Sequence, residues 1–313
     1  MTEPTPQVRA LADAGGFIRR HLGPGPEDRA GMLEALGFET VTELLDATVP
    51  STIRDDAALD LPDAAPEAEI LERLAAIAAE NDPRRAYIGL GYHGTITPAV
   101  IRRNVLEDPG WYTSYTPYQP EISQGRLEAL LVFQTMVGDL TGTELANASL
   151  LDEPTAAAEG LQLCRRVSRK RVDEDAGEVV LVDAACHPQT LEVVTGRMTP
   201  LGVEVVVCDL REELAGAPGQ RPDHVTAPDG ATVALDRAAA ALLQSPDTDG
   251  RVHDDTDLIA HLHDHQVLST VATDLLACTL VTPPGEQDAD VVVGSSQRFG
   301  VPMMAGGPHA AFM

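Results

Sequence analysis

A short stretch rich in glycine and tyrosine, residues 87–128, holds the side chains of this sequence that are best suited to chemistry. Three of the chain's five tyrosines lie between residues 112 and 118. Glycines at 89, 91 and 94 favour a tight turn, and two prolines stiffen the segment YTPYQPE that follows. The candidate site residues on these loops are Tyr92, His93, Thr95, Tyr115, Tyr118, Gln119 and Glu121.

Hydroxyl, imidazole and amide groups on stiffened loops can orient a small zwitterion with little loss of entropy. We therefore expect these residues to line the entrance or wall of an active site, where Glu121 either carries a proton or holds His93. The structural alternative is that they pack the loop against a helix predicted over residues 123–139. The residue types are compatible with both interpretations.

The rest of the chain divides into a helical beginning and an alternating remainder. Helices are predicted over residues 26–37, 39–47 and 67–81, the first started by a proline and stopped by a glycine. Beyond residue 142, apolar strands alternate with single helices, which predicts a mostly parallel sheet covered on both faces. The strands are expected at 179–184, 203–209, 241–244, 267–274 and 290–294, and the helices at 152–167, 187–198 and 255–265. Residues 211–238 are too weakly patterned to assign.

Several long motifs resemble one protein family. They are FIRRHLGP (17–24), YTPYQPEISQGRLEALLVFQTMVGDLTG (115–142), SLLDEPTAAAE (149–159), CHPQT (186–190) and GSSQRFGVPMMAGGPHAAF (294–312). These runs resemble, in order, the N-terminal half of the glycine-cleavage P-protein family, the decarboxylating glycine dehydrogenases. The resemblance implies a fold-type I large domain of the class that uses pyridoxal 5'-phosphate (PLP). It also implies that the complete protein decarboxylates glycine on PLP and passes the aminomethyl group to the lipoyl arm of H-protein.

A PLP enzyme needs a lysine amine to form the Schiff base, and the only lysine here is Lys170, in the basic run RRVSRKR. The resemblance places the family's Schiff-base lysine in the C-terminal half, in a segment related to residues 295–307. This chain has Gln297 and Arg298 there; an amide is not nucleophilic, and arginine keeps its proton. We therefore expect a catalytically silent copy of the domain that binds no cofactor.

The helix entered at Asp152 supports the same expectation. In the family's relatives the matching helix N-terminus holds the cofactor phosphate, which free N–H groups and the helix dipole favour. Here Asp152 and Glu153 occupy that end, and carboxylates repel a second anion. A capped helix with acids in its first turn is the favoured interpretation.

Three further sites have alternative interpretations. Asp274 either pairs with a pyridine nitrogen or, as we favour, ends a strand; His187 either stacks on a ring or starts a helix. The run HLHDH invites a metal site, but alternate residues of a helix do not share a face. We expect no metal at His261, His263 and His265.

Composition restricts the partners. The formal net charge of −27 disfavours nucleic acid and anionic membranes. The four cysteines have no CxxC spacing, which is typical of a reducing compartment. Neither a leader nor a long apolar run is recognisable, so we expect a soluble, cytoplasmic protein.

The sequence thus predicts a helical segment over residues 1–86 and a partial aminotransferase-like α/β domain over residues 87–313, incomplete at its C-terminus. Strand edges and apolar segments such as VPMMAG (301–306) and AAFM (310–313) are then expected to lie uncovered. The predicted partners are H-protein, glycine and a lysine-bearing C-terminal half or separate chain, in a homo- or hetero-oligomer. The alternatives are a non-catalytic subunit that shapes a site on another chain, and a stand-alone binding module.

Overall fold

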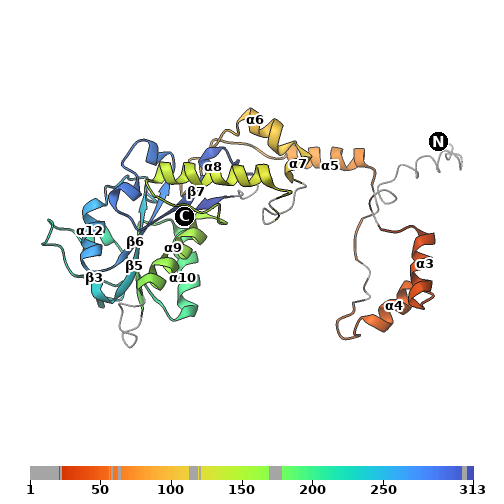
Figure 1. The fold of residues 1–313 in the computed structure, drawn as a ribbon, viewed down its shortest axis with the longest axis horizontal. Helices are drawn as coiled ribbons and strands as arrows, with labels where there is room; N and C mark the ends of the chain where they lie inside the picture. Colours follow the sequence, from red (N-terminus) through yellow and green to blue (C-terminus); the bar gives the residue numbers. More distant parts are fainter. Residues whose placement is uncertain are drawn as a thin grey trace. The chain divides into compact units, whose positions relative to one another are not determined.

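The computed structural model describes residues 21–313 except 22, 56, 58, 63–64, 113–118, 120, 169–177 and 305–308. The chain divides into two units, Met1–Asp82 and Pro83–Met313. Element labels follow Figure 1.

The first unit contains three described helices of eight or more residues, at the places that the sequence predicts: α3 (Pro26–Leu36), α4 (Val41–Thr48) and α5 (Glu67–Ala79). Gly37 ends α3 in the left-handed conformation, with φ of 80°. Thr40 caps α4 by accepting from the N–H of Glu43 at 3.2 Å, while the Glu43 carboxylate accepts from the N–H of Glu39 at 2.9 Å. The apolar stripe of α5 is exposed within this unit.

The second unit begins with short helices and a long one. These are α6 (Ala99–Ile101), the π-helical turn η1 (Arg102–Leu106), α7 (Pro109–Tyr112) and α8 (Gln124–Thr141). The long helix confirms the prediction for residues 123–139. Gly142 ends it with φ of 75°.

A six-stranded sheet forms the centre of this unit, in the order β2-β1-β5-β6-β7-β8 (Figure 1). Its strands are β1 (Val179–Asp183), β2 (Glu204–Cys208), β5 (Ala238–Ser245), β6 (Leu268–Asp274), β7 (Val291–Ser295) and β8 (Ala311–Phe312). Every pairing is parallel except that of β7 with β8. The predicted mostly parallel α/β fold is confirmed.

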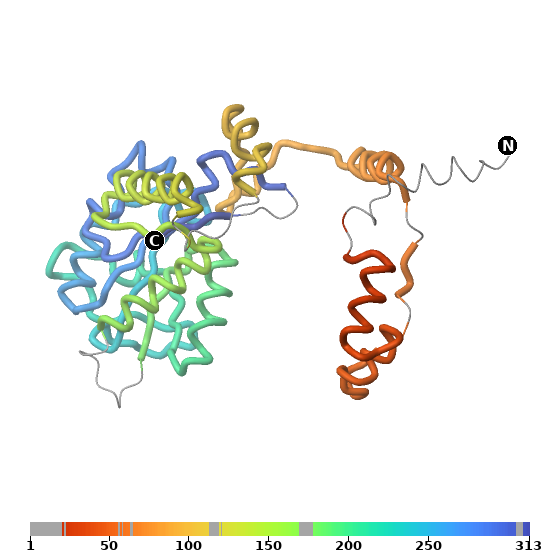
Figure 2. The backbone as a smooth tube through the Cα atoms, turned by 45° about the vertical axis from the view of Figure 1, so that its right-hand side comes forward, coloured from red at the N-terminus to blue at the C-terminus, as the bar shows by residue number. Residues whose placement is uncertain are grey.

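Helices cover both faces of this sheet because its strand side chains alternate between two buried clusters. Val180 and Val182 point to the cluster formed with α9 (Glu153–Ser168) and α10 (Pro188–Met198), which lie side by side in Figure 2. Leu181 points to the opposite cluster, which includes residues of α12 (Thr256–Asp264). Gly160 lets α9 approach the sheet, since a Cβ there would meet Cγ2 of Thr270 at 2.9 Å.

Two parts of the α/β unit depart from the sequence analysis. Residues left unassigned form α11 (Leu210–Glu213) and the antiparallel hairpin of β3 (His224–Thr226) with β4 (Thr232–Ala234). The expectation that residues 310–313 lie uncovered is wrong for Ala311 and Phe312. Both are 0% exposed, because β8 pairs with β7 and Phe312 packs beneath α8 in a third apolar cluster.

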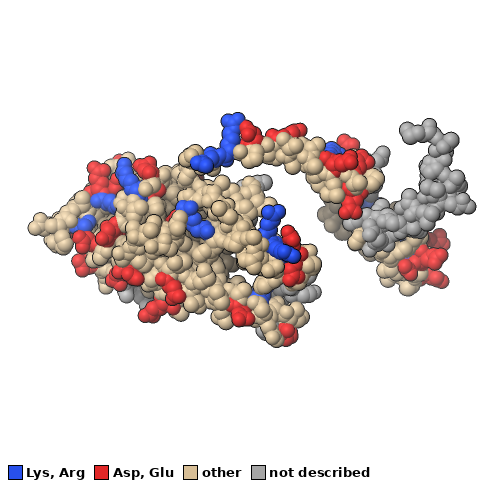
Figure 3. All heavy atoms as spheres, turned by 90° about the horizontal axis from the view of Figure 1, so that it is seen from above, with Lys and Arg blue, Asp and Glu red and all other residues tan. Residues whose placement is uncertain are grey.

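On the face shown in Figure 3, Asp and Glu side chains are more numerous than Lys and Arg side chains, in agreement with the net charge. None of the helices in the described part of the chain is long and apolar enough to cross a membrane.

Candidate functional site

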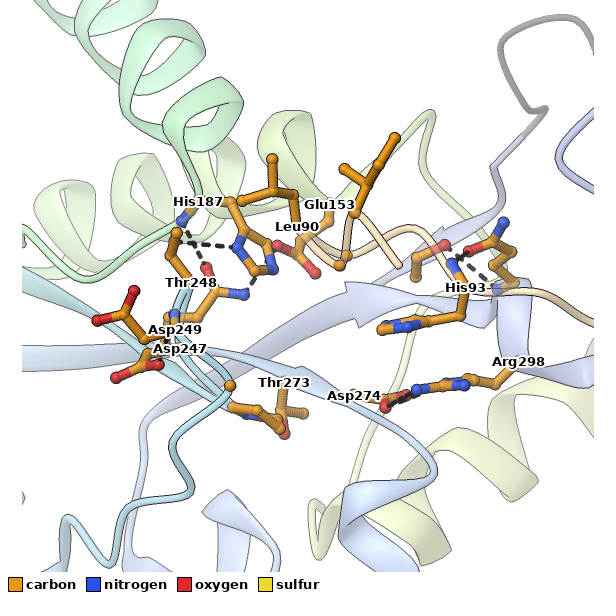
Figure 4. Close-up of a pocket in the computed structure, with 18 of the residues that line it drawn as sticks. Leu90, His93, Glu153, His187, Asp247, Thr248, Asp249, Thr273, Asp274 and Arg298 are labelled. Carbon is orange, nitrogen blue, oxygen red and sulfur yellow. Dashed lines mark hydrogen bonds and ion pairs between the residues drawn. The ribbon is translucent and has the colours of Figure 1, made fainter. Parts of the chain in front are cut away.

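A pocket of about 310 Å³ opens at the carboxyl ends of the parallel strands, the edge where open α/β sheets bind ligands. Gln244 comes from the end of β5, Asp274 from the end of β6, and Ser295 from the end of β7. The glycine-rich turn beginning at residue 87 and the loop 246–250 form further walls. Figure 4 shows His187, Glu153 and His93 around this space, with Asp274 and Arg298 along one side of it.

An ion pair closes one side of the pocket. The Asp274 carboxylate accepts from Nε of Arg298 at 3.0 and 3.1 Å and from Nη2 at 2.7 Å. Asp274 is the last residue of β6, and Arg298 lies in the 3₁₀ turn η7 (Ser296–Phe299) that follows β7. Adjacent parallel strands thus bring the two residues together. Asp274 ends its strand as the sequence favours, and its partner is an arginine of this same chain.

Glu153 occupies the beginning of α9 and faces the pocket. Asp152 is the cap, because its Oδ1 accepts from the N–H of Thr155 at 2.9 Å, which confirms the capped helix. Oε1 of Glu153 accepts from Nε2 of Gln244 at 3.2 Å. Burial raises the pKa of Glu153 to about 7, with smaller contributions from Asp274 and Asp152 that act in the same direction.

Two neutral histidines complete the walls. His187 precedes α10, as one of the two interpretations holds, and its Nδ1 lies 3.2 Å from the hydroxyl of Thr248. Burial lowers the pKa of His187 to about 4, and the neighbouring His93 contributes to that shift. The pKa of His93 is lowered as well, first by burial and then by the charge of Arg298. A Cβ on Gly91 would lie 3.2 Å from the His187 ring, so this turn needs glycine to approach it.

A half-buried arginine, Arg211, holds the strand ends behind the pocket. Arg211 contacts the Asp183 carboxylate at the end of β1, and its Nη2 donates to the carbonyl of Gln244 at 3.0 Å. Its Nε and Nη2 also donate to Asp255 at 2.8 Å each. Asp183 is 0% exposed, so the guanidinium compensates a fully buried carboxylate. The same network fixes Gln244, which in turn orients Glu153.

The structure separates the site residues predicted in the glycine-rich turn. His93 lines the main pocket, with its N–H donating to Oε1 of Gln297 at 3.4 Å. Tyr92 instead lines a smaller neighbouring hollow, where its ring meets that of His309 edge-to-face at 5.2 Å. The Thr95 hydroxyl donates to the carbonyl of Val301 at 2.8 Å, so this side chain anchors the turn.

The structure describes two of the four remaining predicted residues. Tyr115 and Tyr118 fall outside the described residues. Gln119 is partly buried, and its Oε1 has no hydrogen-bond partner among the described residues. Glu121 is exposed. The structure thus brings His93 together with Gln297 and Arg298, and the active-site roles of all seven residues stay predictions.

The pocket also contains residues that the sequence analysis did not single out, namely Gln244, Asp247 and Thr248. Asp247 contacts Nε2 of His253 at 2.8 Å. The sequence does contain a signal for such residues, because a polar residue directly follows each apolar strand core. Parallel strands bring these polar residues to one edge of the sheet.

His261 and His263 of α12 and the C-cap residue His265 do not converge on one point. His261 contacts the carbonyl of Pro222 at 2.8 Å, and His263 contacts the Asp290 carboxylate at 2.8 Å. The His265 ring lies 4.9 Å from that of His261. Among the described residues, no group of three or more His, Cys, Asp or Glu is arranged to hold a metal ion.

Comparisons with known proteins agree with this architecture. A crystal structure of glycine decarboxylase (P-protein) of the glycine cleavage system, in inhibitor-bound form, matches with a TM-score of 0.77 and 31% identity. The match covers 93% of this chain and 62% of that chain. Glutamate decarboxylase from Lactobacillus brevis shares the fold, with a TM-score of 0.54 and 13% identity over 88% of this chain and 61% of that chain. Fold and site position define an α/β protein of the fold-type I class.

The sequence comparisons give the family. The family model described as glycine cleavage system P-protein matches residues 19–313, and the chain belongs to this family. It is 50% identical over 302 residues to glycine dehydrogenase (decarboxylating) from Synechocystis, which covers 96% of this chain and 28% of the relative. It is 52% identical to glycine dehydrogenase (decarboxylating) 2 from Pseudomonas fluorescens, over 96% of this chain and 29% of the relative. The chain thus spans less than a third of these relatives.

Proposed function

We propose that this chain forms the N-terminal, non-catalytic part of a glycine decarboxylase, the P-protein of the glycine cleavage system. The observation that carries this proposal is the family match over residues 19–313. The complete protein decarboxylates glycine with PLP as the electron sink and transfers the aminomethyl group to the lipoyl arm of H-protein. Glycine and H-protein are therefore the proposed substrate and partner of the whole assembly.

PLP does not fit the pocket of this chain. The N-terminus of α9 is where a phosphate would bind. It already presents the Glu153 carboxylate to the pocket. Asp274, which would pair with a pyridine nitrogen, instead binds Arg298 through two guanidinium nitrogens. An arginine and an amide, Gln297, follow β7 where a lysine would be needed. In this proposal a lysine-bearing remainder, or a separate chain, holds the cofactor.

An exposed apolar segment supports a role in assembly. Between residues 88 and 145 the α/β unit exposes large apolar side chains, including Ile88 at 75%, Ile96 at 91%, Leu106 at 59%, Leu131 at 64% and Leu145 at 87%. Exposed apolar surface of this extent marks interaction sites. We assign it to contact with the lysine-bearing part, and in this proposal Tyr92 lies at the entrance to the neighbouring active site.

Reconstitution tests the proposal. The chain is co-expressed with the lysine-bearing remainder of the Synechocystis relative, and the purified material is assayed for exchange of bicarbonate into the glycine carboxyl group with H-protein and PLP present. We expect exchange only when both parts are present and co-purify. Exchange by this chain alone would overturn the proposal, and so would undiminished exchange by the remainder without it.

A further inference from the structure

The pocket keeps an arginine with unused hydrogen-bonding capacity. Asp274 engages Nε and Nη2 of Arg298, and Nη1 has no hydrogen-bond partner among the described residues. Figure 4 shows the Arg298 side chain extending beneath the ring of His93 towards Asp274. Because the carboxylate fixes the guanidinium plane, a second acceptor can bind Nη1 without ordering a flexible side chain.

The pocket also keeps a carboxylate with a free oxygen. Oε1 of Glu153 accepts from Gln244, whereas Oε2 receives no hydrogen bond from any described residue. Gln244 is itself fixed, since its Oε1 accepts from the N–H of His187 at 3.1 Å and its carbonyl accepts from Arg211. Glu153 is therefore a positioned acceptor that suits an ammonium group.

The imidazoles between these two groups are uncharged. The pKa values of His93 and His187 both lie below the ordinary value, chiefly because of burial. The ring nitrogens of His93 have no partner among the described residues, so they can add one hydrogen bond to a ligand. The rings separate the cationic end of the pocket from the acidic wall without adding charge to either.

The distribution of charge selects the ligand. A simple anion would meet the carboxylates of Glu153 and Asp274 in the same space, whereas a simple cation would leave Nη1 of Arg298 unused. A molecule that carries both charges satisfies both ends. The volume of about 310 Å³ is at the lower end of the range of small-molecule sites, about 300–1,000 Å³.

We propose that this pocket is a binding site for a small free amino acid, whose carboxylate accepts from Nη1 of Arg298 and whose ammonium donates to Oε2 of Glu153. The site goes beyond the proposed function, which requires no ligand in this pocket. The place from which PLP is excluded then holds a free amino acid instead.

Calorimetric titration of the whole chain with glycine, the smallest zwitterion, tests this proposal at pH 8, where the Glu153 carboxylate is ionised. Acetate and methylamine, which each carry one of the two charges, are the matched comparison ligands. We expect saturable binding of one glycine per chain, with both comparison ligands at least tenfold weaker. Absence of saturable glycine binding at up to tens of millimolar would overturn the proposal, as would equal binding of acetate.

Variants identify the site. Glu153→Gln keeps the acceptor oxygen that Gln244 contacts and removes the charge, and it is expected to weaken glycine binding at least tenfold. Glu159→Gln lies on the same helix, 43% exposed and paired with Arg197 on the surface, and should bind glycine as the unaltered chain does. Arg298→Gln provides a second variant should Glu153→Gln fold poorly, as judged by circular dichroism. Unchanged affinity in the folded variants would overturn the assignment.

Discussion

At the residue scale, Glu153 and His187 face one pocket with pKa values displaced in opposite directions. Burial disfavours the charged form of each, so the folded chain keeps Glu153 protonated up to pH about 7 and His187 neutral down to pH about 4. The raised pKa of Glu153 adds to the free energy of unfolding below pH 4.5, the ordinary pKa of a glutamate. This contribution is lost as the pH rises to about 7. The lowered pKa of His187 adds to the free energy of unfolding above pH 6.5, the ordinary pKa of a histidine. This contribution is lost as the pH falls to about 4.

The contributions of Glu153 and His187 change with pH in opposite directions, so they largely cancel in the free energy of unfolding of the unaltered chain. A variant is needed to separate them. Glu153→Gln removes the cost of ionising this carboxyl group. We expect equal stability at pH 4.5 and a variant more stable by about 1–2 kcal/mol at pH 8, after allowing for screening by water at this partly exposed group. Urea unfolding at both pH values measures this difference. A pH-independent difference in Glu153→Gln would contradict this explanation.

At the element scale, one turn fastens the glycine-rich loop to the end of the sheet. The hydroxyls of Thr95 and Thr97 donate to the carbonyls of Val301 and Gly300. Gly300 has φ of 117°, and a Cβ there would lie 2.9 Å from the carbonyl oxygen of Ile96. Only glycine accommodates both the backbone conformation and the close approach. The position of His93 in the pocket depends on this turn.

Gly300→Ala therefore combines strain with a backbone clash, and we expect it to lower the free energy of unfolding by about 2 kcal/mol or more. Gly196→Ala is the matched control, because Gly196 lies inside α10 with open space around its Cβ direction. That substitution should raise stability by about 0.5–1 kcal/mol. Thermal unfolding of both variants provides the measurement, and equal effects of the two would contradict this role of Gly300.

Local sequence pattern predicts the longer elements of this fold but not the contacts between them. A long apolar run such as residues 267–274 can be recognised as a strand from its local sequence alone. The same holds for the other longer strands and for the longer helices. The hairpin β3–β4 and the two-residue strand β8 are too short for a periodic signal, and β8 exists through its pairing with β7. The pair Asp274–Arg298 depends on strand order, since 24 positions separate its members and only adjacent β6 and β7 bring them together. Burial of Glu153 likewise requires the packing of α9.

At the scale of the whole molecule, exposed apolar side chains outside the core define the proposed contact with the lysine-bearing part. Leu131 on α8 is 64% exposed, so Leu131→Glu should leave the melting temperature of the isolated chain unchanged within about 2 °C, as for other exposed positions. The charge would be buried on assembly, and we expect at least tenfold weaker association in a pull-down titration. Leu201→Glu is the control, 52% exposed and outside the segment 88–145. Equal loss of association in both variants would contradict the assigned surface.

We propose that this α/β unit excludes PLP, the cofactor that the complete protein uses. The most direct measurement is borohydride reduction of the reconstituted protein with PLP, followed by peptide mapping of the fixed adduct. We expect one label per assembly of this chain with its lysine-bearing part, on a lysine outside residues 1–313. We expect no label on this chain alone. Stoichiometric label on Lys170, the chain's only lysine, would contradict it.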